Sequence, residues 1–284
     1  MENQFVSLII PTFEDWDSLS KCLESIDNLD YPEDLFETIV VNNNPSAVVP
    51  TEILNENIVL LEEQKPGSYS ARNTGLMKAK GDIIAFTDSD CKVHSDWLIE
   101  IVSALKDCDL VGGNVKCYLE NDINKVSRYY DLYNGFPQQY YVHKLHGSVT
   151  ANLAVRKEVL DNIGFFDSEL YSGGDIEWCQ RAVKKGYNLQ YNANQIVYHP
   201  ARTLKELGVK KRRVTGGLFL KSGMNRWIYF FKKILSICVF PIRYFFNPLE
   251  QKRGVRLFRD SFYLELVALH ESFKIALKKT LQNK

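Results

Sequence analysis

Residues 67–91 read GSYSARNTGLMKAKGDIIAFTDSDC, and the order of features in this stretch decides the fold. From Gly67 to Lys80 the sequence predicts a helix, capped near Ser68 and closed by Gly81. The apolar run from Ile83 to Thr87 then predicts a buried strand. Two aspartates follow this strand directly, so the stretch delivers acidic side chains to the end of a strand.

The same alternation of strand and helix extends toward the N-terminus. An apolar run from Phe5 to Ile10 precedes a segment from Trp16 to Leu29 in which apolar residues recur at helical spacing. Short strand-like runs follow at 38–41 and 58–61. Alternating strands and helices indicate βαβ units and a largely parallel sheet, whose ligands bind at the carboxyl ends of the strands. We therefore predict an α/β fold with its site at that edge.

The C-terminal half is less regular and holds no internal repeat. We expect helices over 97–105 and from Asp175 to Gly186, strands over 110–118 and 149–155, and an edge strand over 189–197. From 226 to 246 the composition becomes aromatic and aliphatic, but a basic pair and a proline interrupt it. Such a segment is too interrupted to span a bilayer, which requires about 20 apolar residues.

Composition excludes several classes of protein. The chain has 284 residues, 45% of them hydrophobic and 25% charged, which fits one large α/β domain with a modest appendage. It has 35 basic and 35 acidic residues, so the overall charge shows no sign of a nucleic-acid partner. The six cysteines form no CxxC pair, which favours free thiols in a reducing compartment over a zinc site. The N-terminal segment MENQFVSLIIPTF has no basic region and too short an apolar run for a signal peptide, so we expect a cytoplasmic protein.

Asp88, Ser89 and Asp90 carry the sharpest chemical signal. In an extended backbone alternate side chains share a face, so both carboxylates can converge on one cation while Ser89 points away. Oxygen ligands suit Mg²⁺ or Mn²⁺, which typically bridge the phosphates of a substrate. The alternative is a plain acidic turn at the end of a strand, and the motif alone does not decide between the two.

The stretch 67–91 resembles the donor-binding segment of the inverting glycosyltransferase family 2, which has the GT-A fold. VSLIIPTFEDWDSLSKCLESI, IGFFDSEL and GGDIEWCQRAVKKGY resemble the family's opening strand and helix, its acceptor-side GxFD element and the start of its catalytic helix. Together these segments cover most of residues 5–200 in the family's order. The resemblance implies a Rossmann-like, mostly parallel central sheet flanked by helices.

The resemblance also implies a division of the chain. Residues 1–205 would form the GT-A catalytic domain, with a nucleotide-sugar half over 1–92 and an acceptor half over 93–205. Residues 206–284 would form a helical C-terminal extension. The implied reaction is the inverting, hexosyltransferase-like transfer of a sugar from a nucleotide-diphosphate sugar, with UDP preferred, to a hydroxyl of a saccharide or lipid-linked acceptor in surface polysaccharide synthesis. The cofactor would be Mn²⁺ or Mg²⁺.

Residue by residue, the resemblance assigns a donor site. Asp88 would approach the ribose or diphosphate, and Asp90 would bind the metal whose charge stabilises the departing nucleotide diphosphate. Arg72 would face the phosphates, since a guanidinium suits phosphate oxygens, although a surface helix arginine is the alternative. The remaining residues expected to bind the nucleotide sugar are Pro11, Thr12, Glu14, Asn42, Asn43 and Ser89.

Three residues depart from, or add to, this donor pattern. Asn42 and Asn43 stand where the family commonly has aspartates that accept a hydrogen bond from uracil. Asparagine keeps a carbonyl acceptor but adds a donor, so pairing with uracil survives while exclusion of other bases weakens. An Asn-rich turn without a ligand is the alternative. His199 stands where several members supply a third metal ligand, and a structural histidine is its alternative.

Asp175 falls in the family's catalytic motif and would be the general base that removes the proton from the acceptor hydroxyl. A single displacement implies inversion. Asp175 is equally placed to be only the N-cap of its helix. Gly174 replaces an acidic residue of the family, which puts an acceptor contact in doubt, and Glu177 follows. Trp178 and Arg181 are further candidates for acceptor contacts, with packing as their alternative.

Residues 227–246 combine aromatic residues with Lys232, Lys233 and Arg243, a composition suited to the lipid headgroup region. We expect peripheral contact with the inner face of the membrane, or else a helical hairpin that packs on the catalytic domain or on a second copy in a homo-oligomer. A nucleotidyltransferase is disfavoured because PTFEDWDS lacks a Gly-rich basic loop. A degenerate family member acting as a scaffold, suggested by Asn43 and Gly174, is the alternative function.

Overall fold

The computed structural model describes residues 4–54, 57–119, 130–132, 134–170, 172–246 and 254–277. They fall into two compact units. The first comprises Met1–Tyr118, Phe136–Leu170 and Gly174–Pro200, and the second comprises Leu119–Gly135, Tyr171–Gly173 and Ala201–Lys284. The domain boundaries expected from the sequence, after residues 92 and 205, stay predictions.

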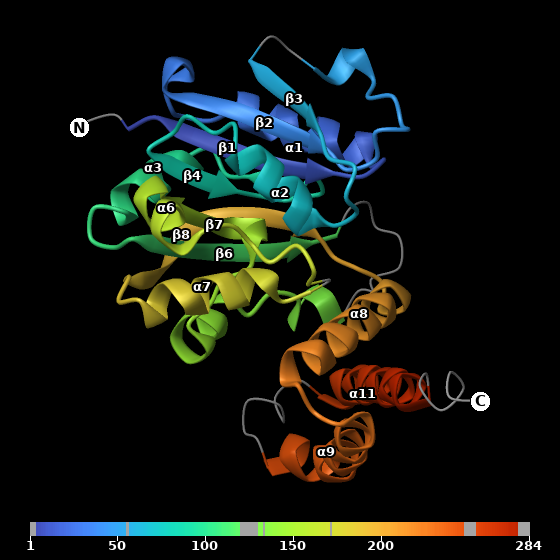
Figure 1. The fold of residues 1–284 in the computed structure, drawn as a ribbon. Coiled ribbons are helices and arrows are strands. Elements are labelled where there is room, and N and C mark those ends of the chain that lie inside the picture. The colour runs from blue at the N-terminus through green and yellow to red at the C-terminus, as the bar shows by residue number, and fades with distance from the viewer. Residues whose placement is uncertain are drawn as a thin grey trace. The chain divides into compact units, whose positions relative to one another are not determined.

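The first unit is built on an eight-stranded mixed sheet in the order β3-β2-β1-β4-β7-β6-β8-β5 (Figure 1). The strands are β1 Val6–Thr12, β2 Phe36–Asn42, β3 Ile58–Glu62, β4 Ile83–Phe86, β5 Lys92–Val93, β6 Leu110–Tyr118, β7 Leu153–Arg156 and β8 Leu189–Pro200. Strands β3, β2, β1 and β4 run parallel to one another, and β6 runs parallel to β8. Strand β7 is antiparallel to β4 and β6, and β5 is antiparallel to β8. The predicted α/β fold is confirmed, with its parallel part in the N-terminal half.

Helices cover both faces of this sheet. Those of the first unit are α1 Trp16–Asp27, α2 Ser68–Leu76, α3 Trp97–Ala104, α5 Gln138–Tyr140, α6 Lys157–Ile163 and α7 Gly174–Lys184. Short 3₁₀ turns span Glu33–Leu35, Thr51–Ile53 and Thr150–Asn152, and a π-helical turn spans Tyr141–Leu145. The helices separate into two sets according to the face that they cover.

Alternate residues of β1 explain the two sets. Leu8 and Ile10 belong to a core with α1 and α3, in which Trp97 is fully buried. Ile9 belongs to the opposite core with α2, α6 and α7, in which Trp178 is fully buried. Every residue of β1 is buried, as expected for a central parallel strand with helices on both faces.

Three expected elements differ from the structure. The strand expected over 149–155 begins as the 3₁₀ turn, because the buried Asn152 side chain donates to Asn114 O and Gln195 O at 2.9 Å and cannot join an apolar strand. The strand expected at an edge, β8, lies between β6 and β5 and continues to Pro200. Helix α2 ends at Leu76, short of the expected Lys80.

The second unit contains α8 Leu204–Ser222, α9 Arg226–Phe246 and α11 Gly254–Leu277. A capping box of Thr203 and Glu206 starts α8. Tyr229 on α9 donates a hydrogen bond to Thr215 O on α8 at 3.1 Å, and Lys211 on α8 pairs with Glu265 on α11 at 2.7 Å. The predicted C-terminal helices are present, and among the described residues no helix is long and apolar enough to cross a membrane.

All six cysteines are free thiols, and four of them are buried. Burial raises the pKa of Cys108 to about 11 and that of Cys179 to about 12, so both thiols stay protonated at neutral pH. This agrees with the expected core and surface thiols.

Candidate active site

The site lies at the carboxyl ends of three neighbouring parallel strands. Strand β1 ends at Thr12 and β2 at Asn42, and β4 is followed by Asp88. Because β2, β1 and β4 are parallel neighbours, these ends share one edge of the sheet. The residues expected at the donor site therefore come together as the strand order requires.

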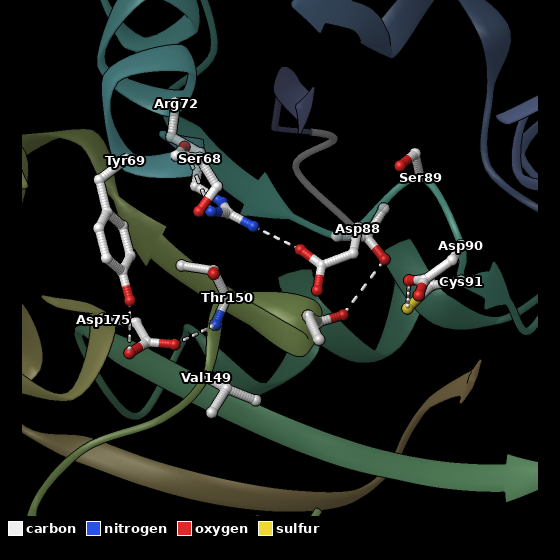
Figure 2. Close-up of polar contacts among 12 residues, drawn as sticks. Ser68, Tyr69, Arg72, Asp88, Ser89, Asp90, Cys91, Val149, Thr150 and Asp175 are labelled. Carbon is white, nitrogen blue, oxygen red and sulfur yellow. Dashed lines mark hydrogen bonds and ion pairs between the residues drawn. The ribbon is translucent and has the colours of Figure 1, made fainter. Parts of the chain in front are cut away.

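Arg72 is a buried cation that pairs with Asp88. It rises from α2, and its side chain is 4% exposed. Its guanidinium forms an ion pair with Asp88 Oδ1, and Nη1 donates to Ser68 O at 3.3 Å (Figure 2). Its Nε is buried and has no hydrogen-bond partner among the described residues. This burial excludes the surface-arginine alternative and leaves one N–H of the cation unused.

Asp90 and His199 form the second pair. His199 Nε2 lies 3.1 Å from Asp90 Oδ2, and the imidazole is 1% exposed. The other ring nitrogen, Nδ1, lies 2.6 Å from Pro200 O, which places its proton on Nδ1 in the neutral ring. Nε2 then presents a lone pair to a carboxylate oxygen, an arrangement that only a proton or a metal cation between the two makes favourable.

Cys91 adds a third donor atom to this cluster. Ligand atoms of Asp90, Cys91 and His199 lie within 4.8 Å of one another. The Cys91 thiol is fully buried, and desolvation raises its pKa well above the ordinary value. The donor set that fits a divalent cation is therefore the carboxylate and the imidazole, because thiols bind metals chiefly as thiolates.

Ser89 points away from the two aspartates, but residues 89 and 90 lie in a turn and not in the expected extended backbone, and the two carboxylates contact different partners, Arg72 and His199. Its hydroxyl donates to Asp15 Oδ2 at 2.6 Å. Asp15 Oδ1 accepts from the Thr12 hydroxyl at 2.7 Å and from Phe13 N at 3.3 Å. Asp15 thus ties the loop after β1 to the loop after β4. Sequence analysis missed Asp15, although its position three residues after Thr12 is typical of a carboxylate in a side-chain turn.

Asn42 and Asn43 hold loops in place. Asn42 Nδ2 donates to a carbonyl of the following turn at 3.1 Å. Asn43 Nδ2 donates to Glu63 O and Lys65 O, both at 2.9 Å, and its Oδ1 accepts from Gly67 N at 2.7 Å. The amide protons of Asn43 are therefore used within the chain, and its contact with a base stays a prediction that rests on the amide oxygen.

Pro11, Thr12 and Glu14 occupy the end of β1 and the loop after it. Pro11 and Thr12 are buried, and Glu14 is exposed. Glu14 has a φ of 58°, a left-handed conformation uncommon outside glycine, and its carboxylate accepts a hydrogen bond from the Asn44 side chain. Glu14 and Asn44 thus link the loops after β1 and β2.

Asp175 lies inside the first turn of α7, which begins at Gly174, so it is not the residue that caps the helix. Its Oδ1 accepts from Ile176 N at 2.9 Å and from the Tyr69 hydroxyl at 3.2 Å. Its Oδ2 accepts from Thr150 N at 3.4 Å. Burial raises the pKa of Asp175, an effect that the Ile176 N–H and Arg72 oppose in part. A carboxylate with a raised pKa is better matched to proton abstraction near neutral pH.

Tyr69 is a site residue that sequence analysis missed, although it lies in the stretch that decides the fold. Its hydroxyl accepts a hydrogen bond from Gly174 N at 2.9 Å as well as donating to Asp175. A Cβ atom at position 174 would lie 2.8 Å from the Tyr69 ring. The structure therefore explains why glycine stands at position 174. Tyr69 lies three residues before Arg72, a helical spacing that places both on one face.

Two residues expected to contact the acceptor instead make hydrogen bonds within the chain. Trp178 is fully buried, and its indole N–H donates to Gly164 O at 2.7 Å, so packing rather than acceptor contact describes it. Arg181 donates to the carbonyls of residues 163 and 165 and pairs with Glu177 at 2.8 Å. The acceptor contact expected of Trp178 is thus not supported, because its surface is covered, and the guanidinium of Arg181 already holds a loop.

The sequence matches known families. Residues 7–164 match the model of glycosyl transferase family 2. Glycosyltransferase AglE of Haloferax volcanii is 37% identical over 222 residues, which are 75% of this chain and 72% of that protein. A dolichyl N-acetyl-α-D-glucosaminyl phosphate 3-β-D-2,3-diacetamido-2,3-dideoxy-β-D-glucuronosyltransferase of Methanococcus voltae is 24% identical over 83% of this chain and 81% of its own length.

Solved structures share the fold. The mannosyltransferase PcManGT of Pyrobaculum calidifontis, in complex with GDP-Man and Mn²⁺, has a TM-score of 0.60 at 20% identity over 97% of this chain and 74% of that one. TarS of S. aureus, in complex with UDP-GlcNAc, has a TM-score of 0.55 at 15% identity over 98% and 92%. These similarities agree with a GT-A, Rossmann-like arrangement of sheet and helices.

Proposed function

The chain belongs to glycosyl transferase family 2, and on that premise we propose that it moves a sugar from a nucleotide-diphosphate sugar to a hydroxyl of a saccharide or lipid-linked acceptor. The transfer inverts the anomeric carbon. The observation that carries this proposal is the ion pair between the buried Arg72 and the partly exposed Asp88, together with the buried carboxylate of Asp175. One helix, α2, reaches both of them (Figure 2).

The donor binds at the edge where β1, β2 and β4 end. The unused Nε–H of Arg72 is a charge-assisted donor for a diphosphate oxygen. Asp90 and His199 would hold a divalent cation, which would supply positive charge beside the departing nucleotide diphosphate. A set of one carboxylate and one imidazole suits Mn²⁺ better than Mg²⁺, which prefers oxygen ligands alone. Pro11, Thr12, Glu14, Asn42, Asn43 and Ser89 shape this donor site through the loops described above.

The acceptor binds on the side of α7. Asp175 takes the proton of the acceptor hydroxyl as that oxygen forms a bond to the anomeric carbon. The bond between the anomeric carbon and the diphosphate breaks on the opposite side, and its electron pair leaves with the nucleotide diphosphate. Gly174 leaves the space that the Tyr69 ring fills beside this carboxylate, and Glu177 lies two residues further along the same helix.

The donor base is uracil in our proposal, because Asn42 and Asn43 keep amide oxygens that can accept from the uracil N–H. The structural neighbours bind nucleotide sugars of two different bases, since PcManGT is in complex with GDP-Man and TarS with UDP-GlcNAc. The acceptor is lipid-linked in our proposal, in the assembly of a surface glycan. The Methanococcus voltae relative is named for a dolichyl-linked acceptor.

A lipid-linked acceptor lies at a membrane, and the C-terminal helices suit peripheral contact with one. Residues 201–246 hold eleven Lys and Arg residues and a single acidic residue, Glu206. On α9 the side chains of Trp227, Ile228, Phe231 and Leu235 are exposed at helical spacing. Basic residues beside an exposed apolar stripe fit the surface of an anionic bilayer, as at the inner face of a cell membrane. The side chain of Arg243 lies outside the described residues.

Thermal unfolding with UDP, GDP, dTDP and CDP, each with and without Mn²⁺, tests the donor site. A ligand that binds only the folded state raises the unfolding temperature by mass action. We expect Mn²⁺-dependent stabilisation by UDP that Asp90→Ala abolishes. Asp82→Ala, at an exposed carboxylate before β4, serves as the matched control and keeps the stabilisation. Absence of any shift at millimolar nucleotide overturns the donor-site assignment.

Release of nucleotide diphosphate from UDP-GlcNAc, UDP-glucose and GDP-mannose tests the enzymatic reading. We expect release by the parent and a loss of about 10²- to 10⁴-fold in Asp175→Asn, the range typical of a missing general base. Nucleotide binding without release by the parent, even with membrane extract as the source of acceptor, favours the scaffold alternative instead.

A further inference from the structure

Helix α2 contacts both the donor-side carboxylate and the proposed base through two side chains that lie one turn apart. Arg72 forms its ion pair with Asp88, and Tyr69 donates to Asp175 at 3.2 Å. The guanidinium carbon of Arg72 lies 6.0 Å from the centre of the Tyr69 ring, so the two side chains are neighbours. Figure 2 shows them descending from the same side of the helix, Arg72 toward the donor carboxylate and Tyr69 toward the base.

The two oxygens of Asp175 differ in their hydrogen bonds. Oδ1 accepts from Ile176 N at 2.9 Å and from Tyr69 at 3.2 Å, whereas Oδ2 has one longer bond, 3.4 Å, from Thr150 N. In Figure 2 the oxygen bonded to Thr150 is turned toward the side on which Asp88 lies. An oxygen that already accepts two hydrogen bonds is a poorer proton acceptor than one that accepts a single long bond, so the two oxygens are not equivalent as bases.

We propose that Tyr69 is a positioning residue for the base: its hydroxyl fixes Oδ1 of Asp175 and leaves Oδ2 to take the proton of the acceptor hydroxyl. The inference deepens the proposed function and rests on it, because it takes Asp175 as the base. The proton passes from the acceptor oxygen to Oδ2, and Tyr69 neither gains nor loses a proton in the step. Burial and the nearby charge of Asp175 raise the pKa of the Tyr69 phenol, which keeps it a donor.

The backbone at position 174 completes this arrangement. Gly174 N donates to the Tyr69 oxygen at 2.9 Å, so the hydroxyl is held between that N–H and Asp175. A Cβ atom at position 174 would lie 2.8 to 3.1 Å from three ring carbons of Tyr69. Contacts below 3.0 Å force a shift, so any larger residue at 174 displaces the tyrosine. Tyr69 and Gly174 are therefore a matched pair, in which the phenol takes the space of a side chain at 174.

The direction of the electrostatic effect follows from the groups that face Asp175. Tyr69 and Arg72 face it from α2, Glu177 and the buried thiol of Cys179 lie on its own helix, and the backbone N–H groups of Thr150 and Ile176 donate to it. A hydroxyl that donates to a carboxylate favours the ionised form, so its removal raises the pKa of the carboxyl. More of the base is then protonated at any given pH near that value.

Tyr69→Phe tests the proposal, because it removes the hydroxyl and keeps the ring. The pKa of Asp175 is measured by ¹³C NMR on protein labelled at the aspartate carboxyl carbons, and its signal is identified by its absence in Asp175→Asn. We expect a higher pKa in Tyr69→Phe than in the parent. Tyr31→Phe, which loses a 2.6 Å hydrogen bond to Gln4 O away from the site, is the matched control and leaves the pKa unchanged. An unchanged pKa in Tyr69→Phe overturns the proposal.

Steady-state kinetics distinguish a positioning role of Tyr69 from a merely structural one. The substrate is the nucleotide sugar from which the parent releases nucleotide diphosphate. For Tyr69→Phe we expect kcat to fall about tenfold, since the variant loses one hydrogen bond to a charged group. The donor KM stays unchanged, and the acidic limb of the pH–rate profile moves to higher pH. Equal changes in Tyr69→Phe and Tyr31→Phe contradict the positioning role.

Gly174→Ala gives a second, independent variant. Its Cβ displaces the tyrosine, so we expect the same rise in the pKa of Asp175, and no further rise when Gly174→Ala is added to Tyr69→Ala. An additive effect contradicts the matched pair.

Full activity of Asp175→Asn overturns the proposed base, whereas an inactive Asp175→Asn with an unshifted pKa in Tyr69→Phe overturns this inference alone.

Discussion

Asp175 shows how a single buried carboxylate links stability to activity. Burial raises its pKa above the ordinary value, so the folded chain holds this proton at a pH where the unfolded chain has released it. Stability therefore falls as the pH rises from the ordinary aspartate value, about 4, through the pKa of the folded state. A residue placed for chemistry in this way lowers the stability of the fold at neutral pH.

Replacement of Asp175 by asparagine removes this titration. We expect the unfolding free energy of Asp175→Asn to rise relative to that of the parent as the pH increases from below about 4 to neutrality, because only the parent has to ionise a buried group. Urea denaturation at a series of pH values measures the difference. The exposed Asp161→Asn supplies the control, and a difference that does not vary with pH contradicts the prediction.

At the level of residues, the sequence predicts part of the site. The convergence of Arg72, Asp88 and Asp90 at one strand end agrees with the structure, because position after a strand fixes the edge of the sheet. Tyr69 could not be selected in this way, since its partner Asp175 lies 106 residues away. Trp178 was expected at the acceptor. An aromatic residue on an amphipathic helix gives the same sequence pattern whether it faces a ligand or the core, so the sequence could not distinguish the two.

At the level of elements, α2 also holds the loop after α6. Asn73, next to Arg72, donates to Phe166 O at 2.9 Å and accepts from Phe166 N at 3.0 Å. The Phe166 ring packs on Tyr69, with centroids 5.8 Å apart, and on Trp178 at 5.5 Å. Of two adjacent residues of this helix, Asn73 thus binds a loop and Arg72 pairs with Asp88, so the position of the loop is linked to that of the candidate site.

Asn73→Ala tests this link. It leaves two backbone groups of Phe166 without their partner, and we expect a loss of about 1–3 kcal/mol in the unfolding free energy. Chemical denaturation measures the loss. Asn162→Ala, which removes an exposed hydrogen bond to Glu158 O at 2.8 Å, is the control and changes the stability by less than about 0.5 kcal/mol. A loss no larger than that of the control contradicts the role of Asn73.

Elements of the parallel half follow from apolar runs and helical spacing, and their bounds agree with the structure within a few residues. The prediction is wrong where buried polar side chains organise the chain. Asn152 accepts from Trp97 Nε1 at 2.9 Å and from Gln195 Nε2 at 2.6 Å, so a segment read as a strand forms a turn. Such a hydrogen-bond network joins residues that are far apart in the sequence, so the local spacing of apolar residues does not reveal it.

At the level of the whole molecule, overall neutrality conceals a strong separation of charge along the chain. The chain has 35 basic and 35 acidic residues, yet 201–246 contain one acidic residue and eleven basic ones. A count over the full length therefore misses the segment suited to an anionic surface. The exposed apolar side chains of α9 became visible only with the helix in place, because composition does not say which face is covered.

Vesicle flotation tests the membrane contact. We expect binding to vesicles that contain phosphatidylglycerol, weaker binding in high salt, and little binding to phosphatidylcholine alone. Phe231→Ser with Leu235→Ser lowers the affinity, because each removes an exposed apolar side chain from the stripe. Val48→Ser, at an exposed valine of the first unit, is the control. Equal binding of the double variant and the parent contradicts contact through α9.

The place of β8 in the sheet bears on the order in which a newly made chain matures. β8 is the last strand to be synthesised, yet it fits between β6 and β5, which leave the ribosome much earlier. Until it arrives, β6 has an open edge and Asp90 has no imidazole beside it. The loops after β1, β2 and β4 therefore emerge before the Asp90–His199 pair can form, and a cation held by that proposed pair would bind only after β8 has left the ribosome.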